Sequence, residues 1–345
     1  MRRHARSQAD ERVAIACFMT TPPFRTDEPA GAATRTRPVR PSGPMRRTMT
    51  WLLVLAALAF LAHALAPELS VVRKSMAAIG WQQVVLAALV AIPMYAIKGC
   101  YHLSLLDRIA GERSSRRTGL PIYLQAQIVR YLPGKVWGIV YQSQRMSGTH
   151  RPSEVVIANL WQMATTNALA AGLVVALMLA FRYSYAWLFL LVPVIASVEW
   201  MHRHPAIESW MLKQLARFLP RLAPLASSRP LPPMPWKGTA LLCSEWIFYF
   251  ASFAIMLHGL ADWPERLLLG TWYGGASILA LAAFVVPAGI AVREAIFVAA
   301  PGLTGADAAT LAVTATLARL VFLGAEIAAA ALSSAWTLGT RREPG

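Results

Sequence analysis

Long apolar stretches dominate the chain from about residue 50 onward, and short polar segments separate them. Most of these stretches are long enough for a helix to cross the roughly 30 Å hydrocarbon core of a bilayer. The stretches predicted to be membrane helices are 50–66, 80–98, 155–181, 183–198, 238–260, 267–287 and 307–338. The predicted fold class is therefore an all-α polytopic membrane protein with about seven to eight transmembrane helices.

Two further apolar stretches, 119–141 and 287–303, are interrupted by proline and glycine. These residues end helices, because proline lacks an amide donor and glycine adopts backbone angles that other residues avoid. We expect 119–141 to be re-entrant, entering and leaving the membrane on one side. A short crossing by 287–303, as an eighth element, would return the C-terminus to the side of the N-terminus.

The composition excludes an ordinary soluble domain, since 56% of the residues are hydrophobic, 14% are charged and the mean hydropathy is +0.46. Residues 1–48 are instead rich in arginine, proline and threonine, so we expect a disordered basic tail without a signal peptide. Translation starting at Met45 or Met49 would also explain this tail. The predicted organisation is a tail (1–48), a transmembrane domain (49–338) and a C-terminal tail (339–345).

The basic excess, 33 Lys and Arg against 17 Asp and Glu, concentrates in the N-terminal tail and in the segments 98–119 and 201–237. Cytoplasmic loops of membrane proteins carry such an excess, so both segments and both termini are predicted to be cytoplasmic. The short, slightly acidic segment 261–266 is predicted to lie outside. Because no basic face interleaved with aromatic residues is present, nucleic-acid binding is not expected.

No cofactor, metal or disulfide is expected from the sequence. The three cysteines are scattered without a CxxC pair, and His202 and His204 form the one close histidine pair, without an HExxH motif. A phosphate-binding GxxxxGK[ST] loop is absent as well, so no nucleotide-driven step is visible.

The first interrupted stretch carries two cations around its Pro-Gly pair. Its residues are Arg130, Pro133, Gly134, Lys135 and Trp137, and Gln142 follows shortly after. Charges at membrane depth are costly unless they face a polar interior, which makes this stretch a candidate site. The alternative is a cytoplasmic loop with a tryptophan at the membrane interface.

The second interrupted stretch repeats this pattern with Pro287, Gly289 and the adjacent pair Arg293 and Glu294. Paired interruptions in the two halves of a membrane protein indicate a transport site, because broken helix ends expose amide donors and carbonyls to a ligand. The alternative is a connecting loop with a surface ion pair.

The last helix contains Arg319 and Glu326, seven residues apart on one helix face and about 10 Å apart along the axis. Each therefore needs a partner elsewhere, either substrate or a counter-charge on another helix. The available counter-charges are Glu245, Arg293 and Glu294.

Two further patterns within the helices predict contacts between helices. Asn159, Gln162 and Thr166 recur at helical spacing, which favours hydrogen bonds to neighbouring helices. Gly270 and Gly274 form a GxxxG pattern, which is typical of close helix packing.

The two interrupted stretches resemble those of the lysylphosphatidylglycerol synthase transmembrane-region family, a flippase-like domain. The likeness rests on the run Arg130-Tyr-Leu-Pro-Gly-Lys-Val-Trp137 and on the spacing Pro287-x-Gly-x-x-x-Arg293-Glu294, and with the helix pattern it extends over about 50–338. Ala288 and Ala291 stand where glycine is common in the family.

The resemblance implies a stand-alone inner-membrane bundle of about eight helices, without the soluble aminoacyltransferase domain of the two-domain synthases. It would move an anionic or aminoacylated lipid, or a lipid-linked glycan, between leaflets. Membrane lipids are then the expected partners. Arg130, Lys135 and Arg293 would attract a phosphate group, Glu294 and Glu326 would balance it, and Trp137 and Gln142 would line the path.

Two other functions remain compatible with the sequence. A membrane-embedded transferase acting on a lipid-linked sugar would need a general base, for which Glu245 and Glu294 are the attractive carboxylates. A non-transporting partner of a lipid- or glycan-synthesis enzyme would need no catalytic group.

Overall fold

The structure is a computed structural model, and its fold is helical. It describes residues 79–129, 137–204, 206–207, 210, 213–214, 217, 232–280, 292–299, 301–306 and 308–339. Within these ranges no β-strand is present, in agreement with the predicted all-α class. The predicted tail 1–48, the predicted helix 50–66 and the predicted tail 339–345, apart from Gly339, lie outside the described residues.

Five helices of the described part are long and apolar enough to cross a membrane. They are α4 (Trp81–Ala110), α7 (Pro152–Arg182), the continuous pair η1 (Tyr185–Leu190) and α8 (Leu191–Arg203), α11 (Lys237–Met256) and α15 (Ala308–Gly339). These elements match five predicted stretches. The chain is therefore a multi-pass membrane protein by the length and apolarity of its helices.

Two boundaries differ from the sequence prediction. Helix α4 continues to Ala110, so the first part of the predicted basic loop 98–119 is helical. The helix ends at Gly111, which adopts a left-handed conformation with φ 74° and donates its amide to the carbonyl of Asp107. The predicted span 267–287 corresponds to α12 (Trp263–Leu279), which has 17 residues and is not among the five long apolar helices.

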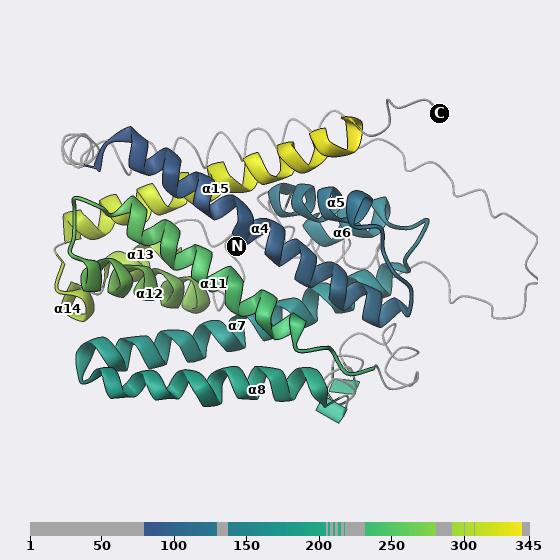
Figure 1. The fold of residues 1–345 in the computed structure, drawn as a ribbon, viewed down its shortest axis with the longest axis horizontal. Helices are drawn as coiled ribbons and strands as arrows, with labels where there is room; N and C mark the ends of the chain where they lie inside the picture. The colour runs from purple at the N-terminus through teal and green to yellow at the C-terminus, as the bar shows by residue number, and fades with distance from the viewer. Residues whose placement is uncertain are drawn as a thin grey trace, which may run out of the picture.

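Helix α4 crosses the bundle diagonally and packs against α11, α15, α7 and α5 (Arg116–Val129) (Figure 1). Two glycines allow the close approach of α4 and α5. A Cβ added to Gly99 would lie 2.4 Å from Leu120, and one added to Gly119 would lie 2.7 Å from Leu103. Larger residues at either position would force these helices apart.

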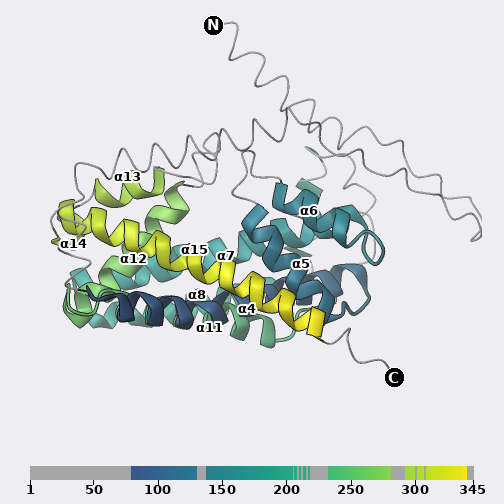
Figure 2. The ribbon, with the colours of Figure 1, turned by 90° about the horizontal axis from the view of Figure 1, so that it is seen from above.

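Two groups of shorter helices lie at opposite ends of the bundle. Helices α5 and α6 (Trp137–Arg145) pack together where α4 finishes and α7 begins, whereas α12, α13 (Val292–Val298) and α14 (Pro301–Thr304) lie where α11 finishes and α15 begins (Figure 1). The indole of Trp272 in α12 donates to the carbonyl of Phe297 in α13 at 3.1 Å. Seen from above, α6 and α13 lie toward the same face (Figure 2).

Basic side chains gather at one end of the bundle, which we call the basic end. This is the end where α4, α8 and α15 finish and where α5, α7 and α11 begin (Figure 1). The described basic residues there include Arg108, Arg113, Arg116, Arg117, Arg145, Arg151, Arg203 and Lys237. The ends of α4 and α8 that carry the two predicted basic segments thus lie on the same side of the bundle.

Exposed aromatic side chains mark both ends of the bundle. Trp81, Tyr183, Tyr185, Trp187 and Trp263 belong to the end opposite the basic end, and Trp200, Trp236 and Trp336 belong to the basic end. Amphipathic aromatic residues are enriched where a membrane meets water. The continuous helical pair η1 and α8 runs from one end of the bundle to the other. It is about 31 Å long, which matches the thickness of a bilayer core.

Candidate functional site

The charges of α13 and α15 meet in one cluster, Arg293, Glu294 and Arg319. Glu294 Oε1 accepts hydrogen bonds from Arg293 Nη2 at 2.8 Å and from Arg319 Nη1 at 2.9 Å. Their side chains are 28%, 18% and 15% exposed in the order Arg293, Glu294 and Arg319. The predicted need of Arg319 for a counter-charge on another element is confirmed.

This cluster carries more positive than negative charge, because two guanidinium groups share one carboxylate oxygen. Its formal charge is therefore +1, from two arginines and one glutamate. The guanidinium carbon of Arg293 lies 4.5 Å from the ring centroid of Tyr273, which places part of the cation over an aromatic face. A cationic group held among apolar helices is chemically suited to an anion.

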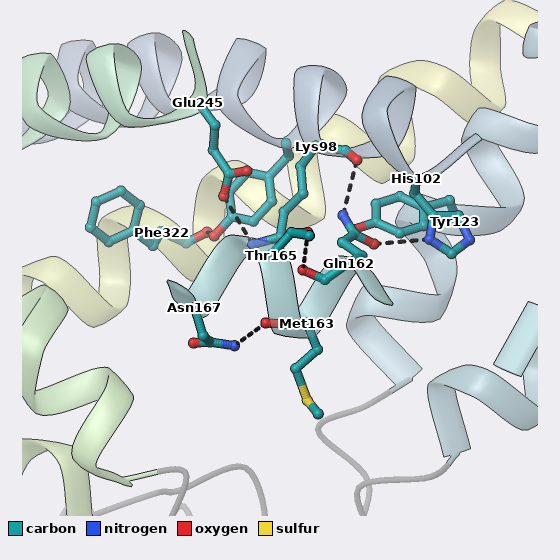
Figure 3. Close-up of polar contacts among 10 residues, drawn as sticks. Lys98, His102, Tyr123, Gln162, Met163, Thr165, Asn167, Glu245 and Phe322 are labelled. Atoms are coloured by element: carbon teal, nitrogen blue, oxygen red, sulfur yellow. Dashed lines mark hydrogen bonds and ion pairs between the residues drawn. The ribbon is translucent and has the colours of Figure 1, made fainter. Parts of the chain in front are cut away.

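A second ion pair joins α4 and α11 at mid-helix. Lys98 Nζ lies 3.0 Å from Glu245 Oε1, and the Glu245 side chain is 7% exposed (Figure 3). Glu245 Oε2 is buried and has no hydrogen-bond partner within the part of the chain that the structure describes. One expectation is corrected here, because Lys98 lies inside a helix rather than in a basic loop. Of the counter-charges available to Arg319, Glu245 pairs with Lys98 and Glu294 pairs with Arg319.

Next to this pair, a buried network of hydrogen bonds surrounds His102. Its Nδ1 lies 2.9 Å from Gln162 Oε1, and its Nε2 lies 2.6 Å from Gln142 Nε2. Since an amide oxygen only accepts and an amide nitrogen only donates, Nδ1 carries the proton and Nε2 accepts. His102 is thus neutral in this arrangement.

The rest of the network ties together α4, α5, α6 and α7. Gln162 Nε2 donates to the backbone oxygen of Lys98 at 3.1 Å and to Tyr123 Oη at 3.0 Å (Figure 3). Asn159 Nδ2 donates to Gln142 Oε1 at 2.9 Å. The predicted hydrogen bonding between helices is confirmed for Asn159 and Gln162, whereas the buried hydroxyl of Thr166 finds no partner among the described residues.

The GxxxG pattern also lies at a helix contact. A Cβ added to Gly270 would lie 3.1 Å from Phe253, and one added to Gly274 would lie 3.5 Å from Trp246. Both neighbours belong to α11, so the two glycines form the face of α12 that packs closely on α11, as the spacing predicts.

The structure brings together only part of the predicted site. Arg293, Glu294 and Arg319 form one cluster, and Trp137 begins α6 and is half-buried. Gln142 is buried with both ends of its amide engaged, and Glu326 is buried on α15. Six predicted residues lie outside the described part: Arg130, Pro133, Gly134, Lys135, Pro287 and Gly289.

The sequence pattern alone did not identify Lys98 and His102 as interior polar groups. The signal was their i, i+4 spacing, which places both on one face of a helix that continues past residue 98. In the described ranges no group of three or more His, Cys, Asp or Glu side chains could hold a metal ion, and Cys100 and Cys243 are unpaired.

Comparison with known proteins gives no relative from which function could be transferred. No protein-family model matches the chain, and neither a curated protein nor a solved structure matches it significantly. Function is therefore inferred from the fold and from the charged groups inside the bundle.

Proposed function

We propose that this chain is an inner-membrane, flippase-like protein that translocates an anionic or aminoacylated lipid, or a lipid-linked glycan, between leaflets. The observation that carries the proposal is the net positive cluster of Arg293, Glu294 and Arg319 among apolar helices. Ionisable residues at membrane depth are costly and usually mark a substrate pathway. Guanidinium groups in particular match the geometry of phosphate oxygens.

The two pairs of short helices support a transport site between them. Helix α5 is about 21 Å long and α12 about 25 Å, both shorter than the roughly 30 Å of a bilayer core. We interpret α5–α6 and α12–α13 as re-entrant hairpins that enter from opposite faces. Broken helices of this kind form substrate sites near the midplane of transporters.

The placement of charge supports an orientation. The basic end carries at least eight basic residues, whereas the opposite end carries Arg182 and Arg266 in the described ranges. By the positive-inside rule we assign the basic end to the cytoplasm, and with the predicted helix 50–66 as a further crossing we propose the same side for both chain termini.

The transferase alternative finds less support in the same geometry. A general base needs a carboxylate able to accept a proton from its substrate. Glu294 is bound by two arginines, and Glu245 is paired with Lys98. Each carboxylate thus already has cationic partners within the protein.

We expect Arg319→Gln to lower the transport rate of an anionic fluorescent phospholipid about tenfold or more, because a charge-assisted hydrogen bond to the head group is lost. The assay measures, in proteoliposomes, the fraction of labelled lipid that becomes accessible to an impermeant quencher. Arg113→Gln, an exposed arginine at the basic end, is the matched control and should transport as the wild type does.

Two results would refute the transport function. One is an unchanged transport rate in Arg319→Gln, and the other is a wild-type protein no faster than protein-free liposomes. The second result, combined with co-purification of a lipid- or glycan-synthesis enzyme, would favour the partner-protein alternative.

The orientation predicts which positions a membrane-impermeant thiol reagent can reach in intact cells. In a cysteine-free background, Tyr183→Cys should be labelled, because Tyr183 lies at the end opposite the basic end and is 73% exposed. Ser115→Cys, exposed at the basic end, should be labelled only after the membrane is opened. Labelling of Ser115→Cys in intact cells would reverse the assigned orientation.

A further inference from the structure

A continuous chain of side-chain hydrogen bonds runs through four helices near the basic end. It joins Glu199 of α8, Thr239 of α11, His202 of α8, Tyr101 of α4 and Thr165 of α7. Thr239 Oγ1 lies 2.5 Å from Glu199 Oε2 and 2.9 Å from His202 Nδ1. Tyr101 Oη lies 2.8 Å from His202 Nε2 and 2.8 Å from Thr165 Oγ1.

This hydrogen-bonded chain of side chains is buried along most of its length and reaches solvent at one end. Tyr101, Thr165 and His202 are fully buried, and Thr239 is nearly so. The Glu199 side chain is 21% exposed and is bound by Arg203. The outer end of the chain therefore meets solvent at the basic end, and the inner end lies among the helices.

Hydrogen-bond chemistry allows two complete proton arrangements when His202 is neutral. With Glu199 ionised, every donor points outward: Thr165 donates to Tyr101, Tyr101 to His202 Nε2, His202 Nδ1 to Thr239, and Thr239 to Glu199. With Glu199 protonated, every donor points inward, and Thr165 donates to a backbone carbonyl of the preceding turn of α7. The two arrangements differ by one proton.

Passage between these arrangements moves one proton along the chain. The Glu199 O–H bond breaks as a Thr239 O–H bond forms, and His202 gains a proton at Nδ1 while it loses one at Nε2. Tyr101 and Thr165 each accept one proton and give up another, so Thr165 releases one proton inward. Every group except Glu199 keeps its original number of protons.

The residues at the inner end follow the residues around the Lys98–Glu245 ion pair by one turn on two helices. Tyr101 follows Lys98 by three residues on α4, and Thr165 follows Gln162 by three residues on α7. Gln162 itself donates to the backbone oxygen of Lys98. One turn is about 5 Å along the helix axis, and in the proposal below a water molecule completes the path from Thr165 to Glu245.

We propose that this hydrogen-bonded chain is a proton path that connects the basic end with the carboxylate of Glu245. Glu245 Oε2, buried without a hydrogen-bond partner in the described ranges, is the acceptor. The charged groups that face the chain are Arg108 of α4 and Arg203 of α8, whereas α7 and α11 contribute uncharged hydroxyls. The proton path goes beyond the proposed lipid activity and does not depend on it.

The test is the rate at which Glu245 becomes protonated in the purified full-length protein after light-triggered release of protons from a caged compound. Time-resolved infrared spectroscopy detects the new carboxylic acid band, and Glu245→Gln assigns the band by removing it. We expect Tyr101→Phe, which keeps the ring and removes the hydroxyl, to slow the appearance of the band at least about tenfold. Tyr183→Phe, at an exposed tyrosine, should match the wild type.

Thr239→Val interrupts the same chain at its outer side and should slow the band to a similar extent. Thermal unfolding of both variants separates a kinetic effect from misfolding. An unchanged rate in Tyr101→Phe, a slow rate in that variant alone, or the absence of a Glu245 band in the wild type would overturn the proton path. Lipid transport is measured separately, so its failure would leave this result intact.

Discussion

Glu294→Ala should destabilise the folded protein by about 3 kcal/mol, because it leaves two guanidinium groups in a mostly apolar setting without their shared carboxylate. Breaking a buried ion pair from one side is more costly than removing both partners, since the remaining charge has been taken out of water. The midpoint of unfolding in detergent micelles, followed by circular dichroism, measures this loss.

Glu112→Ala provides the matched control, because Glu112 is an exposed carboxylate between α4 and α5. Its effect should stay within about 0.5 kcal/mol of the wild type. The double variant Glu294→Ala and Arg319→Leu should regain part of the lost stability, because it removes one stranded charge. If Glu294→Ala were as stable as Glu112→Ala, the cluster would not be an interior ion pair.

Gln142→Leu should cost about 2 kcal/mol of stability. The leucine leaves His102 Nε2 without its donor and one amide hydrogen of Asn159 without its acceptor, both in a buried network. Gln144→Leu, two residues later on the exposed side of α6, should be nearly neutral. Equal melting temperatures of the two variants would show that the network contributes nothing to stability.

The hydrophobic pattern located the long helices because twenty or so apolar residues have few stable alternatives in a membrane. It ended α4 about a dozen residues early, since Lys98, His102 and Arg108 interrupt the apolar run. Lys98 and His102 have partners on other helices, and Arg108 donates to the backbone carbonyl of Pro232. Such partners are a property of the packed fold rather than of the local sequence.

The part of the candidate site that could be predicted from the sequence is the pairing of a membrane-helix charge with an opposite charge. Arg319 required a counter-charge, and Glu294 was among the three available groups. The pairing of Lys98 with Glu245, 147 residues apart in sequence, was not predicted because Lys98 had been assigned to a loop. The buried role of Gln142 also follows from contacts that only the packing of α6 on α4 and α7 creates.

The order of elements occurs twice, with its direction reversed. A long helix, a pair of short helices and a second long helix appear as α4, α5–α6 and α7, and again as α11, α12–α13 and α15 (Figure 1). The first set has its short pair at the basic end, and the second set has it at the opposite end. In topology the two halves are related by a half-turn about an axis in the membrane plane, so each leaflet meets an entrance built from the same kind of parts.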